Sequence, residues 1–253
     1  MMRKKKTRIA DDVFNDLQSS ILSGSYKAGD RLPPERELSQ TLGTNRNTLR
    51  EAIRKLEQFN LVTVRQGQGV TVADFRRSAT IHVLEPFLIH GEDPIEKARA
   101  LMDLLAARIV VLEYATRLAV QRADATDLAR LRDVRQLLLS AFRTQDREAL
   151  AIGYQQWLTA VVDAAHSLPT RWIANPFLEL NRTFMERFPS LWVLDESFPE
   201  YLEATEQAVR TGNTDAALEA NRSYYERIDA VVISMLEQLF VAGDGSNPDP
   251  EME

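Results

Sequence analysis

The sequence contains no cysteine, and this absence excludes several kinds of site at once. Disulfide bonds, thiolate nucleophiles and zinc sites with cysteine ligands are all ruled out. Nothing in the composition requires an oxidising compartment, so we expect a cytoplasmic protein.

Long apolar runs are also lacking, because charges interrupt every hydrophobic stretch well before the roughly 20 residues that a spanning helix needs. The first residues, MMRKKKTRIADD, have no apolar core of the kind found in signal peptides. The sequence therefore predicts neither membrane insertion nor export.

Catalytic motifs are absent too. The only histidines are His82, His90 and His166, and Lys97 is the only lysine after residue 55, which leaves little for Schiff-base chemistry. The serine, histidine and carboxylate residues form no nucleophile elbow, HExxH motif or phosphate-binding loop. We therefore predict no enzymatic activity and no cofactor.

Basic residues gather in the first part of the chain, although the net charge of all 253 residues is −6. Residues 1–76 hold 14 Lys or Arg and 9 Asp or Glu, a net charge of +5, which leaves 17 basic and 28 acidic residues, a net charge of −11, for the rest. Phosphates attract positive charge where they make contact, so this asymmetry is typical of a nucleic-acid-binding module joined to a domain with another role.

The residues up to 76 show the pattern of a winged helix-turn-helix domain. Apolar residues recur every fourth position from Ile9 to Ile21, as on one face of an amphipathic helix. Two more helices flank a tight turn at Gly43, and two β-branched runs then flank a glycine-bearing tip. The predicted elements are helices over 9–23, 35–42 and 46–59, and hairpin strands over 61–64 and 70–72.

The rest of the chain shows helical spacing up to about residue 240, without a strand signal. The predicted helices cover 80–90, 94–121, 125–142, 146–166, 174–187, 199–211 and 214–240. We therefore predict a mainly α protein with a DNA-binding domain at 1–76, an all-helical bundle for effector binding and dimerisation at 77–241, and a disordered tail at 242–253.

The stretch NRNT, residues 45–48, crowds hydrogen-bonding side chains at the start of the third predicted helix. Arginine can donate two hydrogen bonds to guanine and asparagine can pair with adenine, while threonine and backbone amides hold phosphates. An isolated NRNT is more often a solvated helix cap. The short helix before it, the glycine turn, the wing and the basic charge favour DNA binding here.

The stretch RLPPERELSQTLGTNRNTLREAIRKLEQFNLVTVRQGQGVTV resembles the winged-helix domain of the GntR family of bacterial transcription regulators, from Ile9 to Phe75. LPPERELS, TLREAIRKLE and the glycine-bearing wing stand in the family's order. The resemblance implies that the wing tip reaches the minor groove and that these residues face DNA: Arg36, Asn45, Arg46, Asn47, Thr48, Arg50, Gln66 and Gly67. It assigns to the core Leu38, Leu42, Leu49, Ile53, Leu56 and Leu61.

The all-helical remainder resembles the FadR subfamily, whose helical domain binds a small effector and supports a dimer, and DFRRSATIHVLEPF resembles its fatty-acid-responsive type. Many members hold a metal through three histidines on these helices. The corresponding positions here fall near Leu158, Leu202 and Tyr224, which cannot be imidazole ligands. We therefore predict no metal and an organic ligand held by side chains alone.

Arg108, in LLAARIVVLE, matches the fatty-acid-responsive type, and its charge in an apolar helix requires an anionic partner. That partner is either an effector or an internal carboxylate such as Glu113 or Asp163. The residues predicted to bind the effector are Arg108, Tyr154, Trp157 and Tyr224, although aromatic residues at helical spacing also fill cores. Tyr225 and Asp229 stand where that type has small residues, which argues against an identical acyl-CoA pocket.

Together these patterns predict a homodimeric, sequence-specific transcription regulator. A small anionic effector, an acyl-CoA or a small carboxylate, would control its binding to a double-stranded DNA operator. The alternatives are an architectural DNA-binding protein without an effector and an enzyme that acts on a ligand in the helical domain.

Overall fold

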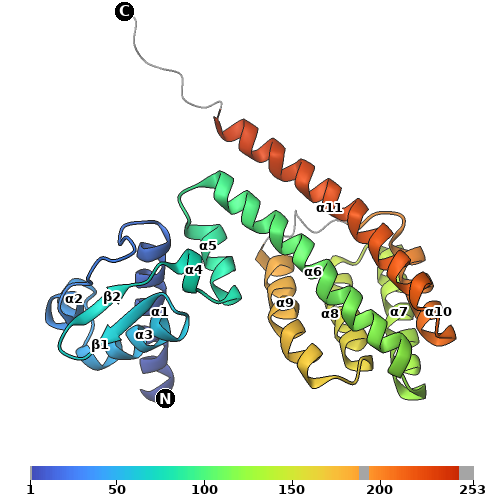
Figure 1. Ribbon diagram of the computed structural model, residues 1–253, viewed down its shortest axis with the longest axis horizontal. Coiled ribbons are helices and arrows are strands. Elements are labelled where there is room, and N and C mark those ends of the chain that lie inside the picture. Colours follow the sequence, from blue (N-terminus) through green and yellow to red (C-terminus); the bar gives the residue numbers. More distant parts are fainter. Residues whose placement is uncertain (1, 188–193, 245–253) are drawn as a thin grey trace, which may run out of the picture. The chain divides into compact units, whose positions relative to one another are not determined.

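The computed structural model describes residues 2–187 and 194–244 of the protein. Contacts within the chain form two compact units that divide between Lys97 and Ala98. Helices make up most of the described part, and one small pair of strands lies in the first unit (Figure 1). The prediction of a mainly α protein with a winged helix-turn-helix and a helical domain is confirmed.

Three helices form the body of the first unit because their apolar residues share one face. They are α1 (Met2–Leu22), α2 (Glu35–Thr41) and α3 (Arg46–Gln58). Val13 and Leu17 of α1 are buried, as are Leu49 and Leu56 of α3. Of the predicted core residues, Leu42 is only partly buried, and the others are buried: Leu38, Leu49, Ile53, Leu56 and Leu61.

A short antiparallel hairpin follows α3, with strands β1 (Val62–Arg65) and β2 (Gly69–Val72). The paired residues are Val62 with Val72, Thr63 with Thr71, Val64 with Val70 and Arg65 with Gly69. Gly67 supplies the left-handed backbone of the tip, with a φ of 74°. On the other edge of β2, the amide of Leu32 donates to the carbonyl of Val70 at 2.9 Å, which fastens the hairpin to the loop before α2.

The chain then forms α4 (Phe75–Ser78), a 3-10 helix η1 (Ile81–Val83) and α5 (Leu84–His90). The sequence predicted one helix over 80–90 and missed α4. Phe87 is buried, and Ser19 Oγ of α1 lies 3.1 Å from His90 Nδ1. By contacts this segment belongs to the first unit, whereas the sequence placed the domain boundary after residue 76.

Long helices form the second unit, and α6 begins just before it. They are α6 (Pro94–Arg122), α7 (Ala125–Thr144), α8 (Arg147–Ala164), α9 (Leu168–Arg187), α10 (Phe198–Thr211) and α11 (Thr214–Asp244). The core contains Leu131 and Leu138 of α7 together with Trp157 of α8 and Leu202 of α10, all fully buried. No described helix is both long enough and apolar enough to cross a membrane.

Three helix boundaries differ from the sequence prediction by several residues. α1 begins at Met2 rather than at residue 9. α9 begins at Leu168 rather than at 174. Pro169 lies in its first turn, where backbone amides have no acceptor within the helix, so the missing N–H of proline costs no hydrogen bond. α11 continues to Asp244, so residues 242–244 of the predicted tail are helical. The remaining tail prediction, 245–253, lies outside the described residues.

Gly153 marks a close approach of α8 to α7. A Cβ atom at this position would lie 2.8 Å from Cδ2 of Leu138. Alanine favours a helix over glycine by about 1 kcal/mol, but overpacking a core costs about 1–3 kcal/mol. We expect Gly153→Ala to lower the free energy of unfolding by about 1 kcal/mol in urea denaturation. In a Leu138→Ala background the same change should raise it. A stabilised single variant would contradict the close contact.

Candidate functional site

The N-terminus of α3 is exposed and firmly capped. Asn45 has an extended backbone, and its side-chain oxygen accepts a hydrogen bond from the amide of Thr48 at 3.0 Å. Arg46 and Asn47 follow with exposed side chains. Among the residues that the structure describes, no carboxylate pairs with Arg46. A fixed first turn therefore presents a long cation and an amide to solvent.

Thr48 does not join them, because its side chain is only 1% exposed. It lies four and eight residues before the buried Ala52 and Leu56, on the face of α3 that packs into the unit. The sequence-based assignment of Thr48 to a DNA contact stays a prediction, but the burial of its side chain was not anticipated. The helical spacing with Ala52 and Leu56 was the signal that identifies it as a core position.

Arg50 and Arg36 lie beside this terminus, and both are exposed. Arg50 Nε donates to both carboxylate oxygens of Glu35, at 3.0 and 2.9 Å. Glu35 was not anticipated, because it lies fifteen residues earlier in the chain, at the start of α2. At the tip of the hairpin, Gln66 and Gly67 are exposed, as the sequence predicted for a wing.

The second unit contains a cavity of about 100 Å³ lined by residues of α6, α8, α9 and α11. Much of its wall is apolar, and includes Leu101, Leu105, Phe177, Leu180, Phe184 and Val232. Arg108, Tyr154, Tyr225 and Asp229 add a polar cluster. Three residues predicted to bind an effector, Arg108, Tyr154 and Tyr224, thus line one cavity.

Arg108 has an internal partner, but a different one from those considered in the sequence. Its Nη2 donates to Oδ1 of Asp229 at 2.5 Å, and its guanidinium carbon lies 4.6 Å from the ring centre of Tyr225. Glu113 instead pairs with Arg222, and Asp163 with Arg130 and Arg171. The Nε of Arg108 is buried and has no hydrogen-bond partner among the described residues.

Burial and charge act in opposite directions on this pair. Burial raises the pKa of Asp229 above its usual value, although the charge of Arg108 and its hydrogen bond lower it. Burial lowers the pKa of Arg108, but Asp229 and the nearby tyrosines together raise the pKa by more, so the net shift is upward. Arg108 is therefore a permanent cation, and the ionised form of Asp229 depends on it.

Trp157 is fully buried and is not part of the cavity wall that the structure describes. Its Nε1 donates to the hydroxyl of Tyr201 at 3.2 Å. The Tyr201 and Tyr225 hydroxyls are 3.3 Å apart, and those of Tyr225 and Tyr154 are 2.7 Å apart. Burial raises the pKa of all three tyrosines, so they remain neutral hydrogen-bonding groups. Trp157 therefore contacts the polar cluster through Tyr201, on the side away from the cavity.

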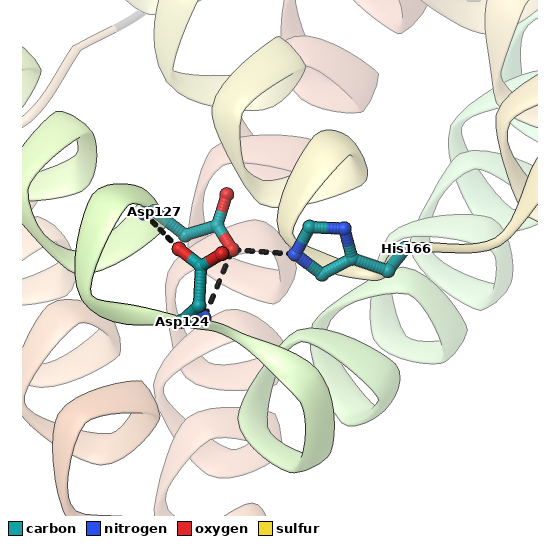
Figure 2. Close-up of side chains that lie close together, drawn as sticks. All are labelled: Asp124, Asp127 and His166. Atoms are coloured by element: carbon teal, nitrogen blue, oxygen red, sulfur yellow. Dashed lines mark hydrogen bonds and ion pairs between the residues drawn. The ribbon is translucent and has the colours of Figure 1, made fainter.

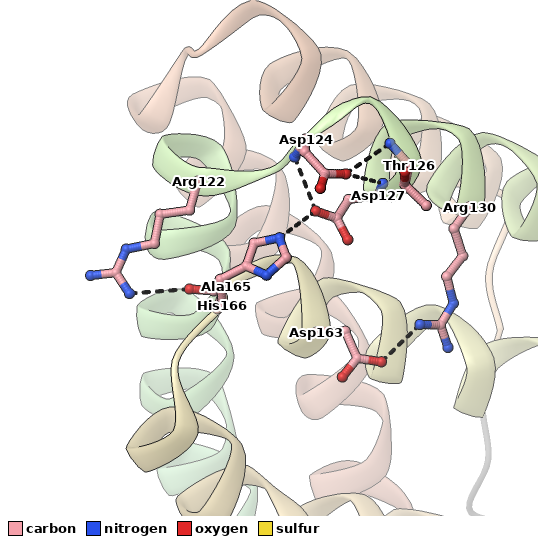
Figure 3. Close-up of polar contacts among 8 residues, drawn as sticks. All are labelled: Arg122, Asp124, Thr126, Asp127, Arg130, Asp163, Ala165 and His166. Atoms are coloured by element: carbon pink, nitrogen blue, oxygen red, sulfur yellow. Dashed lines mark hydrogen bonds and ion pairs between the residues drawn. The ribbon is translucent and has the colours of Figure 1, made fainter.

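In the described residues, one group of side chains has the spacing of metal ligands: Asp124, Asp127 and His166, whose ligand atoms lie within 4.8 Å of one another (Figure 2). Asp124 Oδ1 accepts from the amides of Thr126 and Asp127, at 2.8 and 3.0 Å. Asp127 Oδ2 accepts from the amide of Asp124 at 3.0 Å and lies 2.6 Å from His166 Nε2 (Figure 3). These contacts form a capping box at the start of α7, joined by a histidine that lies two residues after the last residue of α8.

Two family profiles match the chain. Residues 9–72 match bacterial regulatory proteins of the gntR family, and residues 103–227 match the FCD domain. The exposed terminus of α3 and the wing lie within the first match, and most of the cavity lies within the second.

Curated relatives are regulators as well. The HTH-type transcriptional regulator Mce2R of Mycobacterium tuberculosis is 27% identical, over 90% of this chain and 93% of the relative. The galactonate operon transcriptional repressor of Escherichia coli is 28% identical, over 83% and 90%. The fatty acid metabolism regulator protein of Vibrio vulnificus is 31% identical, but over only 42% of this chain and 39% of that protein.

The capping arrangement yields a prediction about metal. Asp124 Oδ1 and Asp127 Oδ2 already accept backbone hydrogen bonds, so a cation there would have to compete with the cap. We expect EDTA to leave the melting temperature unchanged. Zn²⁺ should shift the melting temperatures of wild type and His166→Gln by the same amount. A chelator-induced loss of stability that His166→Gln abolishes would contradict this prediction.

Proposed function

The chain is a DNA-binding transcription regulator of the GntR family with an FCD domain, and we propose how it divides this task between its two units. The first unit reads a double-stranded DNA operator. The second holds a small organic effector and joins two copies into a homodimer, so that effector binding releases the operator, as in a repressor. No catalytic step is required.

The exposed start of α3 carries the proposal for DNA. A helix that enters the major groove presents its first residues to the base edges. Arg46 is long and exposed, and no carboxylate in the described part of the chain pairs with it, so it is suited to the O6 and N7 atoms of guanine. Asn47, next to it, is suited to adenine. Asn45 uses its oxygen in the cap and retains its amide hydrogens for a phosphate.

Arg50 and Arg36 are proposed to hold the phosphate backbone on either side of this helix end. Glu35 binds Nε of Arg50 and thereby fixes the direction of its guanidinium group. The two Nη groups of Arg50 have no partner among the described residues, so they are available to phosphate oxygens. At the wing tip, Gln66 and Gly67 form a narrow, exposed turn that fits the minor groove.

The cavity of the second unit is the proposed effector site. Its apolar wall suits a hydrocarbon chain, and Arg108, Tyr154 and Tyr224 supply polar groups for a head group. An anionic effector, either an acyl-CoA or a small carboxylate, fits the largely buried cation, whose Nε lacks a partner among the residues that the structure describes. The relatives named for fatty acid metabolism and for the galactonate operon are consistent with this class.

A homodimer follows from how such modules read DNA, because a two-fold symmetric pair of helices reads a palindromic operator. The second unit has apolar surface for such an interface. Trp172 and Ile173 of α9 are 66% and 58% exposed, and Val110 and Tyr114, one turn apart on α6, are 67% and 55% exposed.

The first prediction separates base reading from phosphate holding. Arg46→Ala should weaken the free energy of operator binding by roughly 1–3 kcal/mol per half-site and relax the sequence preference at one base pair. Arg50→Ala should weaken operator and scrambled DNA alike and reduce the salt slope by about one unit per half-site. Binding of both variants is measured on both DNAs across a salt series. Arg132→Ala, an exposed arginine of α7, is the matched control and should bind as wild type does.

Two results would contradict this assignment. Equal losses on operator and scrambled DNA for Arg46→Ala would show that Arg46 holds a phosphate. Unchanged binding of both variants would show that α3 does not enter the groove.

A further prediction concerns assembly. We expect sedimentation at micromolar concentration to show a dimer, and the stoichiometry to be two chains per operator. Replacing either Trp172 or Val110 by glutamate should identify the interface, because a charge buried there dissociates the pair. A monomer of the wild type under these conditions would rule out the proposed dimer.

A further inference from the structure

Arg108 has one donor that is paired and a neighbouring donor that is not. Its Nη2 donates to Asp229, and its planar group lies over the ring of Tyr225. Its Nε, which shares an edge of the guanidinium with Nη2, is buried with no hydrogen-bond partner among the described residues. A buried donor without an acceptor is costly and rare in folded proteins. The guanidinium therefore has room for a second acceptor or for a better one.

A carboxylate satisfies arginine best when both of its oxygens meet two donors of the fork. Asp229 contacts Nη2 with one oxygen, and none of the residues that the structure describes offers Nε an acceptor. A ligand carboxylate that bridged Nε and an Nη group would satisfy the orphan donor. The apolar wall, which includes Leu101, Leu105 and Phe184, would at the same time cover the rest of the ligand.

The charges of the cavity allow Arg108 only one anionic partner at a time. Arg108 and Asp229 are the only charged residues in the described cavity wall, and they neutralise each other. A ligand carboxylate would place two anions beside one largely buried cation, and the two anions would repel each other. Burial already raises the pKa of Asp229, so its ionised form is held by Arg108 rather than by solvent. The ligand and Asp229 therefore compete for the same guanidinium.

We propose that Asp229 is an internal substitute for the effector's carboxylate, and that the effector binds by displacing Asp229 from Arg108. The inference rests on the proposed effector site and adds how that site is regulated. In the free protein the pair joins α6 to α11, together with a buried hydrogen bond from Asn221 to Thr116 and the exposed pair of Arg222 and Glu113. Displacement of Asp229 from Arg108 removes this ion pair and leaves the other two contacts between α6 and α11 in place.

The experiment compares an anionic and a neutral probe of the same shape, octanoate and octanamide, on the full chain. Asp229→Asn should bind octanoate about tenfold more tightly than wild type, because the competing anion is gone. Its affinity for octanamide should stay within about twofold of wild type. Arg108→Gln should lose the preference for octanoate over octanamide. Glu113→Gln, which removes the exposed pair between the same helices, is the matched control and should bind as wild type does.

Stability provides a second measurement, because Asp229→Asn leaves Arg108 without its counter-ion and weakens the fold. Octanoate should raise the melting temperature of Asp229→Asn more than that of wild type, and octanamide should not. Asp229→Ser serves if the asparagine variant does not fold. Equal or weaker octanoate binding by the Asp229 variants, including no binding at all, would overturn the proposal.

Release of operator DNA separates this inference from the proposed function. Tight octanoate binding by Asp229→Asn with no release of operator from either protein would support the exchange at Arg108 and refute effector control through this cavity. Release of wild type by octanoate, with the same octanoate affinity in wild type and Asp229→Asn, would support effector control and refute the exchange.

Discussion

A largely buried arginine needs an anionic partner, and this constraint organises the second unit. Arg108 and Asp229 are 121 residues apart in the chain and join α6 to α11 in the wall of a mostly apolar cavity. Separating them would leave a desolvated charge, so the fold keeps α6 and α11 in antiparallel register. The Thr116–Asn221 hydrogen bond, eight residues along α6 and eight back along α11, follows the same register. The tyrosine cluster and Trp157 then pack around this pair.

The DNA-binding unit could be predicted closely because its signals are local. Gly43, the cap residue Asn45 and the β-branched runs of the wing each fix the backbone within a few residues, and the predicted elements agree with α2, α3, β1 and β2 to within one or two positions. The burial of Thr48 was missed because a polar residue in a polar run looks exposed until its spacing from Ala52 and Leu56 is considered.

The candidate effector site could be predicted only in part, because its decisive contacts are distant in sequence. Helical spacing predicted the helices, and the apolar setting of Arg108 indicated that it needs an anion, but spacing does not identify Asp229 among the many carboxylates of this half. Tyr154 and Tyr224 reach the cavity, whereas Trp157, on the same helix as Tyr154, faces Tyr201. Which side of a helix meets a cavity depends on neighbours that periodicity does not specify.

The pair of Arg50 and Glu35 has a consequence for how fast the protein finds its target. In the proposed complex with DNA, Glu35 would stay on Nε of Arg50 and partly offset the charge that the Nη groups offer to a phosphate. Backbone contacts supply nearly all of the affinity for non-target DNA, so this loss of charge would shorten each stay there. At the operator the phosphate contact would be equally weakened, but the proposed base contacts of α3 would prolong the stay. Glu35 would thus reduce the time lost on wrong sites while the protein searches the genome.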